Sequence, residues 1–410
     1  MKPEIVLYVL LAIMALSFAI EKVLSWLNYA QLSRKLPEEL SDVYEEEKYK
    51  KSIDYSKANM KFGFLSSSVS FLVTFILMAL GFFGWFDEFT RTLAVNEIFI
   101  SLLYFGLLML ISDLLNIPFQ LYDTFVIEER FGFNKTTVKT FWVDKLKGYF
   151  LAAIMGGLLL YVLVQLIAYF GPSFWWKFWM VVTLFILFMN MFYTSLILPL
   201  FNKLTPLEDD DLKKAIEDYS KKVGFPLDNI YVMDGSKRSN KSNAFFSGLG
   251  KKKKIVLYDT LVENHTTDEL LAVLAHEVGH YKKKHIISGF VLSALQTGAI
   301  LYIMSRMIFS PVLSEALGGS QMAIHLNLIA FTILFSPISM FLGLFMNAIS
   351  RKNEYEADAY ARDTFNGLAL KEALKKLSVN NLSNLTPHKA YVFFHYSHPP
   401  LLRRLQALGD

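Results

Sequence analysis

The sequence has no cysteine among its 410 residues, which excludes disulfide bonds, thiolate zinc sites and cysteine catalysis. Charged residues are also scarce: they make up 19% of the chain, whereas hydrophobic residues make up 53% and aromatic residues 15%. The net charge of +4 gives no argument for nucleic acid binding, so we expect no nucleic acid partner. A chain so apolar and so poor in charge is typical of a membrane protein embedded in a lipid bilayer.

Seven stretches are long and apolar enough to cross a bilayer, and several of them contain no charged residue. The third stretch carries Asp113, and a charge within a span usually faces protein or water rather than lipid. The predicted spans are residues 5–27, 62–86, 98–121, 148–171, 178–202, 286–308 and 323–349.

Lys and Arg are distributed unevenly between the predicted loops. There are seven of them between residues 34 and 61 and five between residues 123 and 147, but only single ones in the alternate loops. By the positive-inside rule the loops rich in Lys and Arg are cytoplasmic. With seven spans, residues 203–285 and 351–410 lie on that same side, and together they are long enough for one domain.

We therefore expect a mainly α-helical, polytopic membrane protein in four parts. Residues 1–202 hold spans one to five with their loops, and the hairpin of spans six and seven, residues 286–350, divides an α/β catalytic domain into residues 203–285 and 351–410. Each half of that domain adjoins a membrane span. The first half is predicted to contain a helix at 207–223 and strands at 229–233, 243–246 and 254–258.

The sequence His276-Glu277-Val278-Gly279-His280 carries the chemistry. Residues four apart on a helix share a face, so both imidazoles can point at one ion, and neutral imidazole is a preferred zinc ligand. Glu277 lies between them, where it can take a proton from an attacking water. Thr266 and Glu269 predict a capping box that starts this helix. The pattern indicates a zinc peptidase, although chance alone would give it in roughly one chain in a hundred.

A third ligand separates the classes of zinc peptidase. A metzincin would place Gly three residues and His six residues after the second His, where this chain has Lys283 and Ile286. His285 lies about 140° further round a continuous helix, so it cannot reach the same ion. We interpret His285 as a polar residue at the membrane surface.

The remaining solution is a carboxylate from a second helix. Glu354 follows span seven, and Asp358, one turn later, can brace a ligand His through its second ring nitrogen. Glu356 projects from another face and is interpreted as a solvated charge. Because each ligand helix adjoins a membrane span, and we expect it to continue that span, we expect the zinc ion at the membrane boundary.

A peptidase must hold its substrate as an extended chain beside the metal, and the free edge of a sheet can do this by strand addition. Asn243, Ala244, Phe245 and Phe246 lie just upstream of the predicted zinc helix and are our candidates for this edge. An ordinary sheet strand explains the same four residues equally well.

The order of these features resembles the type I CAAX prenyl protease family of membrane zinc metalloendopeptidases. The resemblance extends through almost the whole chain, from the seven spans to a late His398-Pro399-Pro400. It is carried, besides the zinc motif and Glu354 to Asp358, by residues 124–134 (TFVIEERFGFN), 199–207 (PLFNKLTPL), 242–246 and 397–405 (SHPPLLRRL).

The resemblance implies a zincin-like catalytic domain with one zinc ion per chain. It implies that His276, His280 and Glu354 bind this ion, that Glu277 is the general base, and that Asp358 supports a ligand from the outer shell. Members of the family also enclose a large water-filled chamber within the seven helices. Such a chamber would give Asp113, Asn116 and Asn190 a place to face.

The resemblance also implies that His398 and Arg404, at the positions of the family pattern H-P-P-x-x-x-R, hold the substrate carbonyl or the oxyanion. The strand departs from the family's usual Ser-Asn-Ala-Tyr-Phe, because Phe245 stands at the Tyr position. The aromatic ring is kept, so strand addition remains possible.

The expected function is hydrolysis of peptide bonds, either at prenylated C-terminal tails or in membrane proteins during quality control. We expect a bacterial inner membrane in preference to the endoplasmic reticulum. A catalytically silent membrane scaffold of the same fold is the alternative. A seven-span transporter or receptor would leave the zinc motif unexplained, and the heat-shock membrane zinc peptidases are shorter and have fewer spans.

Overall fold

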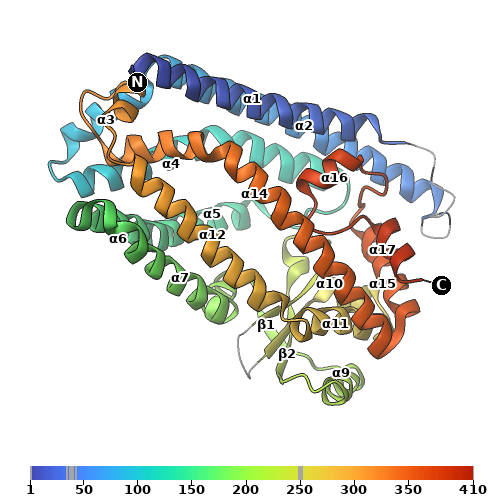
Figure 1. The fold of residues 1–410 in the computed structure, drawn as a ribbon. Helices are drawn as coiled ribbons and strands as arrows, with labels where there is room; N and C mark the ends of the chain where they lie inside the picture. Colours follow the sequence, from blue (N-terminus) through green and yellow to red (C-terminus); the bar gives the residue numbers. More distant parts are fainter. Residues whose placement is uncertain (1, 34–35, 37–40, 42–43, 248–252, 410) are drawn as a thin grey trace.

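The computed structural model describes residues 2–33, 36, 41, 44–247 and 253–409 (Figure 1). Long helices form one part of the molecule, and a small sheet with its own helices forms the other. The long helices are α1 (Pro3–Ala30), α2 (Glu46–Ala79), α4 (Glu97–Tyr122), α5 (Val138–Leu151), α6 (Gly157–Phe170), α7 (Phe174–Phe192), α12 (His285–Met307) and α14 (Ile324–Ala361).

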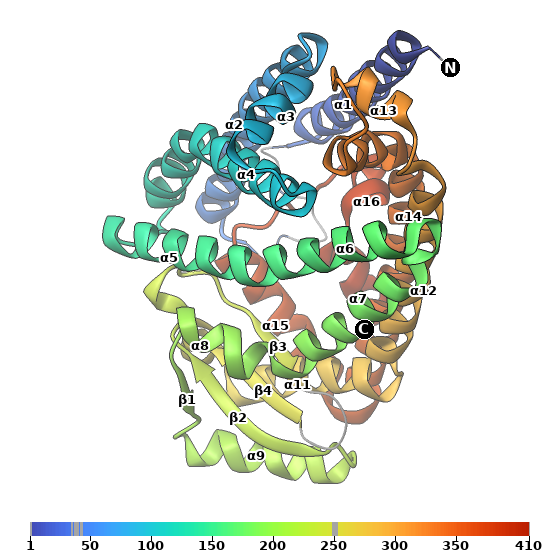
Figure 2. The ribbon, with the colours of Figure 1, turned by 90° about the vertical axis from the view of Figure 1, so that its left-hand side faces the viewer.

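Six continuous helical stretches within the described residues are long and apolar enough to cross a membrane. The fourth, Val138–Phe201, reverses at a short turn, Gly171–Ser173, where Gly171 has a φ of +50°. This turn folds α7 back against α6, as Figure 2 shows, so the fourth stretch makes two passes. Each of the seven predicted spans is therefore mainly helical.

The observed helix boundaries differ most from the predicted span boundaries around the second span. The predicted span 62–86 belongs to a longer helix, α2, which ends at Ala79 because Gly81 adopts a φ of +72°. The chain then forms α3 (Phe82–Leu93), where the sequence predicted a loop from residue 87. Large apolar side chains on the long helices remain exposed, as expected for surfaces that contact lipid. Examples are Leu65, Leu72, Ile76, Leu114, Leu115, Leu158 and Leu184.

Asp113 on α4 has partners inside the protein. Lys145 Nζ lies 2.7 Å from its Oδ2, the Gln120 amide donates to its Oδ1 at 3.1 Å, and the Tyr149 hydroxyl also donates to it. The carboxylate is thus neutralised by an ion pair to α5, which agrees with the rule that charges within spans avoid lipid. Asn190 is exposed and Asn116 is half-buried, and the water-filled chamber stays a prediction.

The sheet has four strands in the order β1-β2-β4-β3. The two central strands are parallel, and each outer strand pairs antiparallel with its neighbour. Three strands were predicted; the three-residue β1 was missed because it is too short for a periodic pattern. The sequence also predicts a turn rich in Gly and Lys between the second and third predicted strands, and residues 248–252 of this turn lie outside the described residues. The strands are β1 (Leu204–Pro206), β2 (Leu227–Met233), β3 (Ala244–Ser247) and β4 (Lys253–Tyr258).

The catalytic part is built around α11 (Thr267–Lys282), which packs against α9 (Asp210–Lys222), α14 and α15 (Gly367–Asn380). Leu270, Leu274 and Val278 of α11 join the core formed with the sheet and with α9. Since α15 follows the membrane hairpin in sequence, both halves of the predicted domain share this core. The smaller helices are α8 (Leu198–Phe201), α10 (Asp259–Asn264), α13 (Pro311–Ala316), α16 (Lys389–His395) and α17 (Leu401–Ala407).

The two junctions between membrane and catalytic parts differ. Helix α14 is unbroken over 38 residues, so the last span runs directly into the segment that carries Glu354 (Figure 1). Helix α11 is not continuous with α12, because the chain turns at Lys283 and Lys284, and Lys284 has a φ of +60°. The expectation of continuity is confirmed for span seven and wrong for span six.

Candidate metal centre and active site

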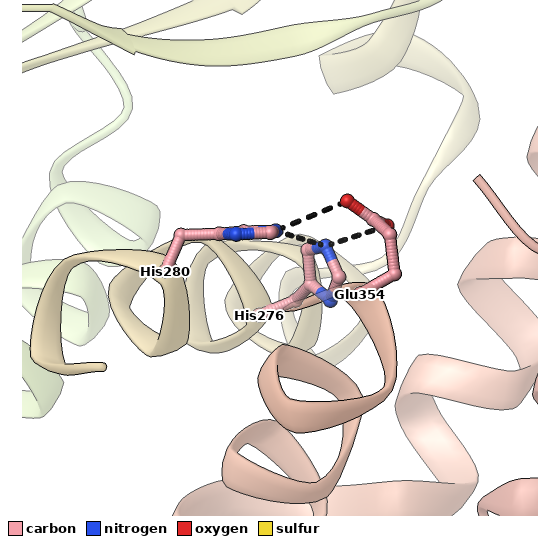
Figure 3. A group of neighbouring side chains, drawn as sticks. All are labelled: His276, His280 and Glu354. Carbon is pink, nitrogen blue, oxygen red and sulfur yellow. Dashed lines mark hydrogen bonds and ion pairs between the residues drawn. The ribbon is translucent and has the colours of Figure 1, made fainter. Parts of the chain in front are cut away.

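Helix α11 begins as the sequence predicted. The Thr266 hydroxyl accepts from the Glu269 backbone N–H at 3.4 Å, and the Glu269 carboxylate accepts from the Thr266 N–H at 2.9 Å. This capping box sets the start of the helix and therefore the rotation of every later residue. His276 and His280 consequently lie one turn apart on the same face (Figure 3).

Three donor groups meet where α11 crosses α14 (Figure 3). His276 Nε2 lies 3.2 Å from His280 Nε2 and 3.5 Å from Glu354 Oε2, and His280 Nε2 lies 3.3 Å from Glu354 Oε1. A tetrahedral zinc ion with ligand bonds of about 2.0–2.1 Å keeps its ligand atoms about 3.3 Å apart. The spacing of the three groups therefore fits a single zinc-sized ion.

Glu354 has the electrostatic properties of a metal ligand. It is almost fully buried, and none of the described residues makes a hydrogen bond to its Oε2. Burial acts to raise its pKa, but the hydrogen bond with His280 and the electrostatic effect of the neighbouring His276 and Arg404 hold the pKa below its usual range. A buried carboxylate with an unused oxygen is typical of a site that binds a cation.

Gly279 explains how the two helices come close enough. A Cβ at this position would lie 3.0 Å from Ala357 Cα and 3.1 Å from the Ala357 carbonyl oxygen, both on α14. A side chain here would require α14 to move away by a few tenths of an ångström. The glycine inside the motif therefore serves the contact that brings Glu354 to the histidines.

The outer side of His276 is braced by a carboxylate, as predicted. Asp358 Oδ1 lies 2.8 Å from His276 Nδ1, and Arg404 donates to both oxygens of Asp358, at 2.9 and 2.6 Å. Burial acts to raise the pKa of Asp358, but these bonds from Arg404 and His276 lower it to about 2. Asp358 is therefore an ionised acceptor that fixes the orientation of the His276 ring.

Glu277 lies within the same site, and burial raises its pKa while the two histidines act against this rise. His398 has an exposed side chain whose Nε2 is 3.3 Å from Glu354 Oε1. Arg404 also reaches the site, but its guanidinium is committed to Asp358, with Nη1 at 3.7 Å from Glu354. Of the two residues expected to face the substrate carbonyl, His398 is exposed and Arg404 is largely buried.

Two family models together cover nearly the entire chain. The model described as CAAX prenyl protease N-terminal, five membrane helices, matches residues 26–203, and the model described as peptidase family M48 matches residues 206–410. The chain belongs to peptidase family M48. It is a membrane metalloprotease of the CAAX prenyl protease type, and membership of this family implies a bound metal.

Known members of family M48 resemble the chain over almost its full length. CAAX prenyl protease 1 of Saccharomyces cerevisiae is 36% identical over 95% of this chain and 92% of the relative, and the homolog of Homo sapiens is 33% identical over 91% and 88%. The crystal structure of S. mikatae Ste24p matches with a TM-score of 0.94 at 36% identity, covering 99% of both chains. These relatives are eukaryotic, so the expectation of a bacterial inner membrane receives no support.

Two hollows meet at the catalytic centre of this M48 protease. One, of about 360 Å³, is lined by Glu277, His280, Glu354, His398 and Arg404 together with Asn243 and Ala244. The other, of about 820 Å³, also reaches Glu277 and His280, and it extends between α12 and α14. Phe245 and Phe246 line this second hollow. Residues of the strand β3 thus line both hollows.

His285 is not the surface residue that the sequence suggested. It is buried, its Nδ1 lies 3.1 Å from His280 Nδ1, and its Nε2 lies 3.1 Å from Glu356 Oε2. Glu356 is accordingly an ion-pair partner, also 3.7 Å from Lys352, rather than only a solvated charge. The sequence reasoning assumed a continuous helix, and no pattern in the lysines before His285 signals the break at Lys284.

Proposed function

We propose that this chain is a zinc metalloendopeptidase that acts at the membrane boundary. The observation that supports this most strongly is the group of His276, His280 and Glu354, whose donor atoms have the mutual spacing of ligands around one tetrahedral ion. Glu277 shares the hollow with these ligands, so a proton acceptor adjoins the metal position. The uneven distribution of Lys and Arg supports a cytoplasmic catalytic side.

Each residue of the site has a part in the proposed reaction. When bound, zinc supplies Lewis acidity toward the scissile carbonyl and lowers the pKa of the attacking water. Glu277 accepts the proton of that water and passes it to the leaving nitrogen. His398 donates a hydrogen bond to the oxygen on which negative charge develops, and Arg404 contributes positive charge nearby while it holds Asp358 in place.

The substrate backbone is proposed to add to the free edge of β3. This strand pairs with β4 on one side, in the register Ala244 with Leu257 and Phe246 with Ile255, and among the described residues no strand pairs with its other side. An extended peptide on that free edge would run past Glu277 and through both hollows. The substrate-binding residues of this proposal are Asn243, Ala244, Phe245 and Phe246.

The names of the relatives, which are CAAX prenyl proteases, support a proposal for the substrate class. We propose prenylated C-terminal tails of proteins as substrates. Cleavage of unprenylated peptides or damaged membrane proteins is the second candidate, because the residues of the site contain nothing specific to a prenyl group. The catalytically silent scaffold receives no support from the relatives, and all the side chains that the reaction requires are present.

The test is zinc content and peptide cleavage by the purified full-length chain in detergent. A farnesylated Cys-a-a-X peptide and its unprenylated twin are compared for wild type and for Glu277→Gln. Cleavage of the farnesylated peptide alone supports processing of prenylated tails, and cleavage of both supports quality control. Zinc without any cleavage by wild type would favour the silent scaffold, and a wild-type chain without zinc would overturn the proposal.

A further inference from the structure

The Nδ1 atoms of the two ligand histidines, which face away from the metal position, have different partners. Asp358 contacts His276 directly, whereas the Nδ1 atom of His280 faces a second histidine, His285, whose far nitrogen faces Glu356. His285 is buried, whereas the Glu356 side chain is 39% exposed, so the arrangement leads from the ligand through the protein interior to solvent. The two ligand histidines are thus supported by carboxylates at different distances.

We propose that His285 and Glu356 form a relay that orients the zinc ligand His280, and that both are positioning residues of the metal site. This inference rests on the proposed function, because it concerns the same metal. The relay joins three elements: α11 supplies the ligand, the first residue of α12 supplies the second imidazole, and α14 supplies the carboxylate.

The positions of the protons follow from the geometry. A neutral His280 that binds a metal through Nε2 must carry its proton on Nδ1. That N–H then donates to His285 Nδ1, at 3.1 Å, which requires the His285 proton to be on Nε2. The His285 Nε2–H in turn donates to Glu356 Oε2, also at 3.1 Å. Each N–H donor of the relay has an acceptor, so one tautomer of each imidazole ring is selected.

The backbone places His285 in the relay. On a continuous helix His285 would lie about 140° away from His280. The left-handed conformation of Lys284, with its φ of +60°, ends α11 and returns the chain so that the His285 ring approaches His280, with ring centroids 5.2 Å apart. A non-glycine residue held in this region costs free energy, which the surrounding contacts must offset.

The experiment measures zinc affinity of the full-length chain in detergent by competition with a chromophoric chelator. His285→Ala and Glu356→Ala are expected to weaken zinc binding by about 10- to 100-fold, the usual effect of removing an outer-shell partner of a metal ligand. Glu356→Gln keeps an acceptor for the His285 N–H and is expected to fall between Glu356→Ala and wild type. Lys352→Ala is the matched control, because it removes the other partner of Glu356 and is expected to change affinity less than twofold.

A double variant distinguishes a relay from two independent effects. If Glu356 acts through His285, adding Glu356→Ala to His285→Ala should weaken zinc binding no further. The ligand-field spectrum of the cobalt-substituted chain should change in both single variants, whereas the thermal unfolding of metal-free Glu356→Ala should match that of metal-free wild type. A wild-type chain that binds no zinc would overturn the proposed function itself. Unchanged zinc affinity in His285→Ala and Glu356→Ala, or multiplying losses in the double variant, would overturn the relay while the proposed function stands.

Discussion

Glu277 and Glu354 are two carboxylates of one hollow with different tasks. Glu277→Gln keeps the size and the hydrogen-bonding capacity of the side chain but removes its ability to accept a proton. We expect turnover of a cleaved peptide to fall by at least 10²- to 10⁴-fold, the usual contribution of general base catalysis, while zinc content stays at the wild-type level. Wild-type turnover by Glu277→Gln would show that another group takes the proton.

At this scale the sequence predicted the proximity of four side chains of the candidate site, whose roles stay predictions. His276, His280, Glu354 and Asp358 were chosen from helical spacing or family resemblance, and the structure brings all four together. His285 was misinterpreted, because its position depends on the backbone angle of one lysine. A single residue in the left-handed region leaves no periodic pattern, so sequence reasoning had no means of detecting it.

At the scale of elements, the contact between α11 and α14 depends on one glycine. Gly279→Ala would gain helix propensity worth about 1 kcal/mol. It would also place a methyl group 3.0 Å from Ala357 Cα, and overpacking of this kind costs about 1–3 kcal/mol. We expect the steric term to dominate, so that the helices separate slightly and zinc affinity falls.

The matched control is Gly343→Ala on α14, where a Cβ would have no atom of the described residues within 4 Å. Thermal unfolding and chelator competition on both variants provide the comparison. Equal zinc affinity in Gly279→Ala and Gly343→Ala would mean that the close approach of α11 to α14 is not needed for metal binding.

The capping box at the start of α11 predicts a pH dependence of stability. Burial acts to raise the pKa of Glu269, but the ion pair with Lys376 on α15 and the hydrogen bond from the Thr266 N–H hold it below the ordinary value of 4.5. A carboxylate whose folded pKa is lowered stabilises the protein above its unfolded pKa and loses this contribution as the pH falls.

Glu269→Gln keeps the capping hydrogen bonds and removes the charge. We therefore expect it to unfold at a lower temperature than wild type at pH 7, and the difference to shrink as the pH falls below about 4.5. Thermal unfolding of metal-free protein in detergent across this range is the measurement. A difference that is constant with pH would argue that the ion pair with Lys376 contributes nothing.

The elements themselves were predicted unevenly. Long apolar runs predicted the membrane-spanning helices. The alternation of apolar and polar residues predicted the three longer strands, which make up most of the sheet. The sequence did not predict the helix α3 or the breaks at Gly81 and Lys284. Each of these features depends on local backbone angles and on packing between distant segments. Hydropathy alone does not record either property.

At the scale of the whole molecule, the metal is expected to join the two halves of a divided domain. Its proposed ligands come from α11, before the membrane hairpin, and from α14, after it. Zinc at a free concentration 100-fold above its dissociation constant should therefore stabilise the folded chain by about 2.7 kcal/mol, and a chelator should remove this increment.

Calorimetry or fluorescence-detected unfolding with and without chelator tests this expectation. Glu277→Gln should keep the response to zinc, whereas Glu354→Ala should lose it together with its bound metal. A zinc-dependent shift that survives in Glu354→Ala would show that Glu354 is not a ligand.

The unbroken helix α14 has a consequence for the lipid around the protein. Its 38 residues make a rod about 57 Å long, with one end in the bilayer and Glu354 near the other. Bilayers thinner or thicker than a hydrophobic span change the tilt of that span, and a tilt of about 2° around the middle of such a rod moves each end by about 1 Å. Displacements of this size alter reaction rates severely. The acyl-chain length of the host membrane is thereby coupled to the geometry of the catalytic centre.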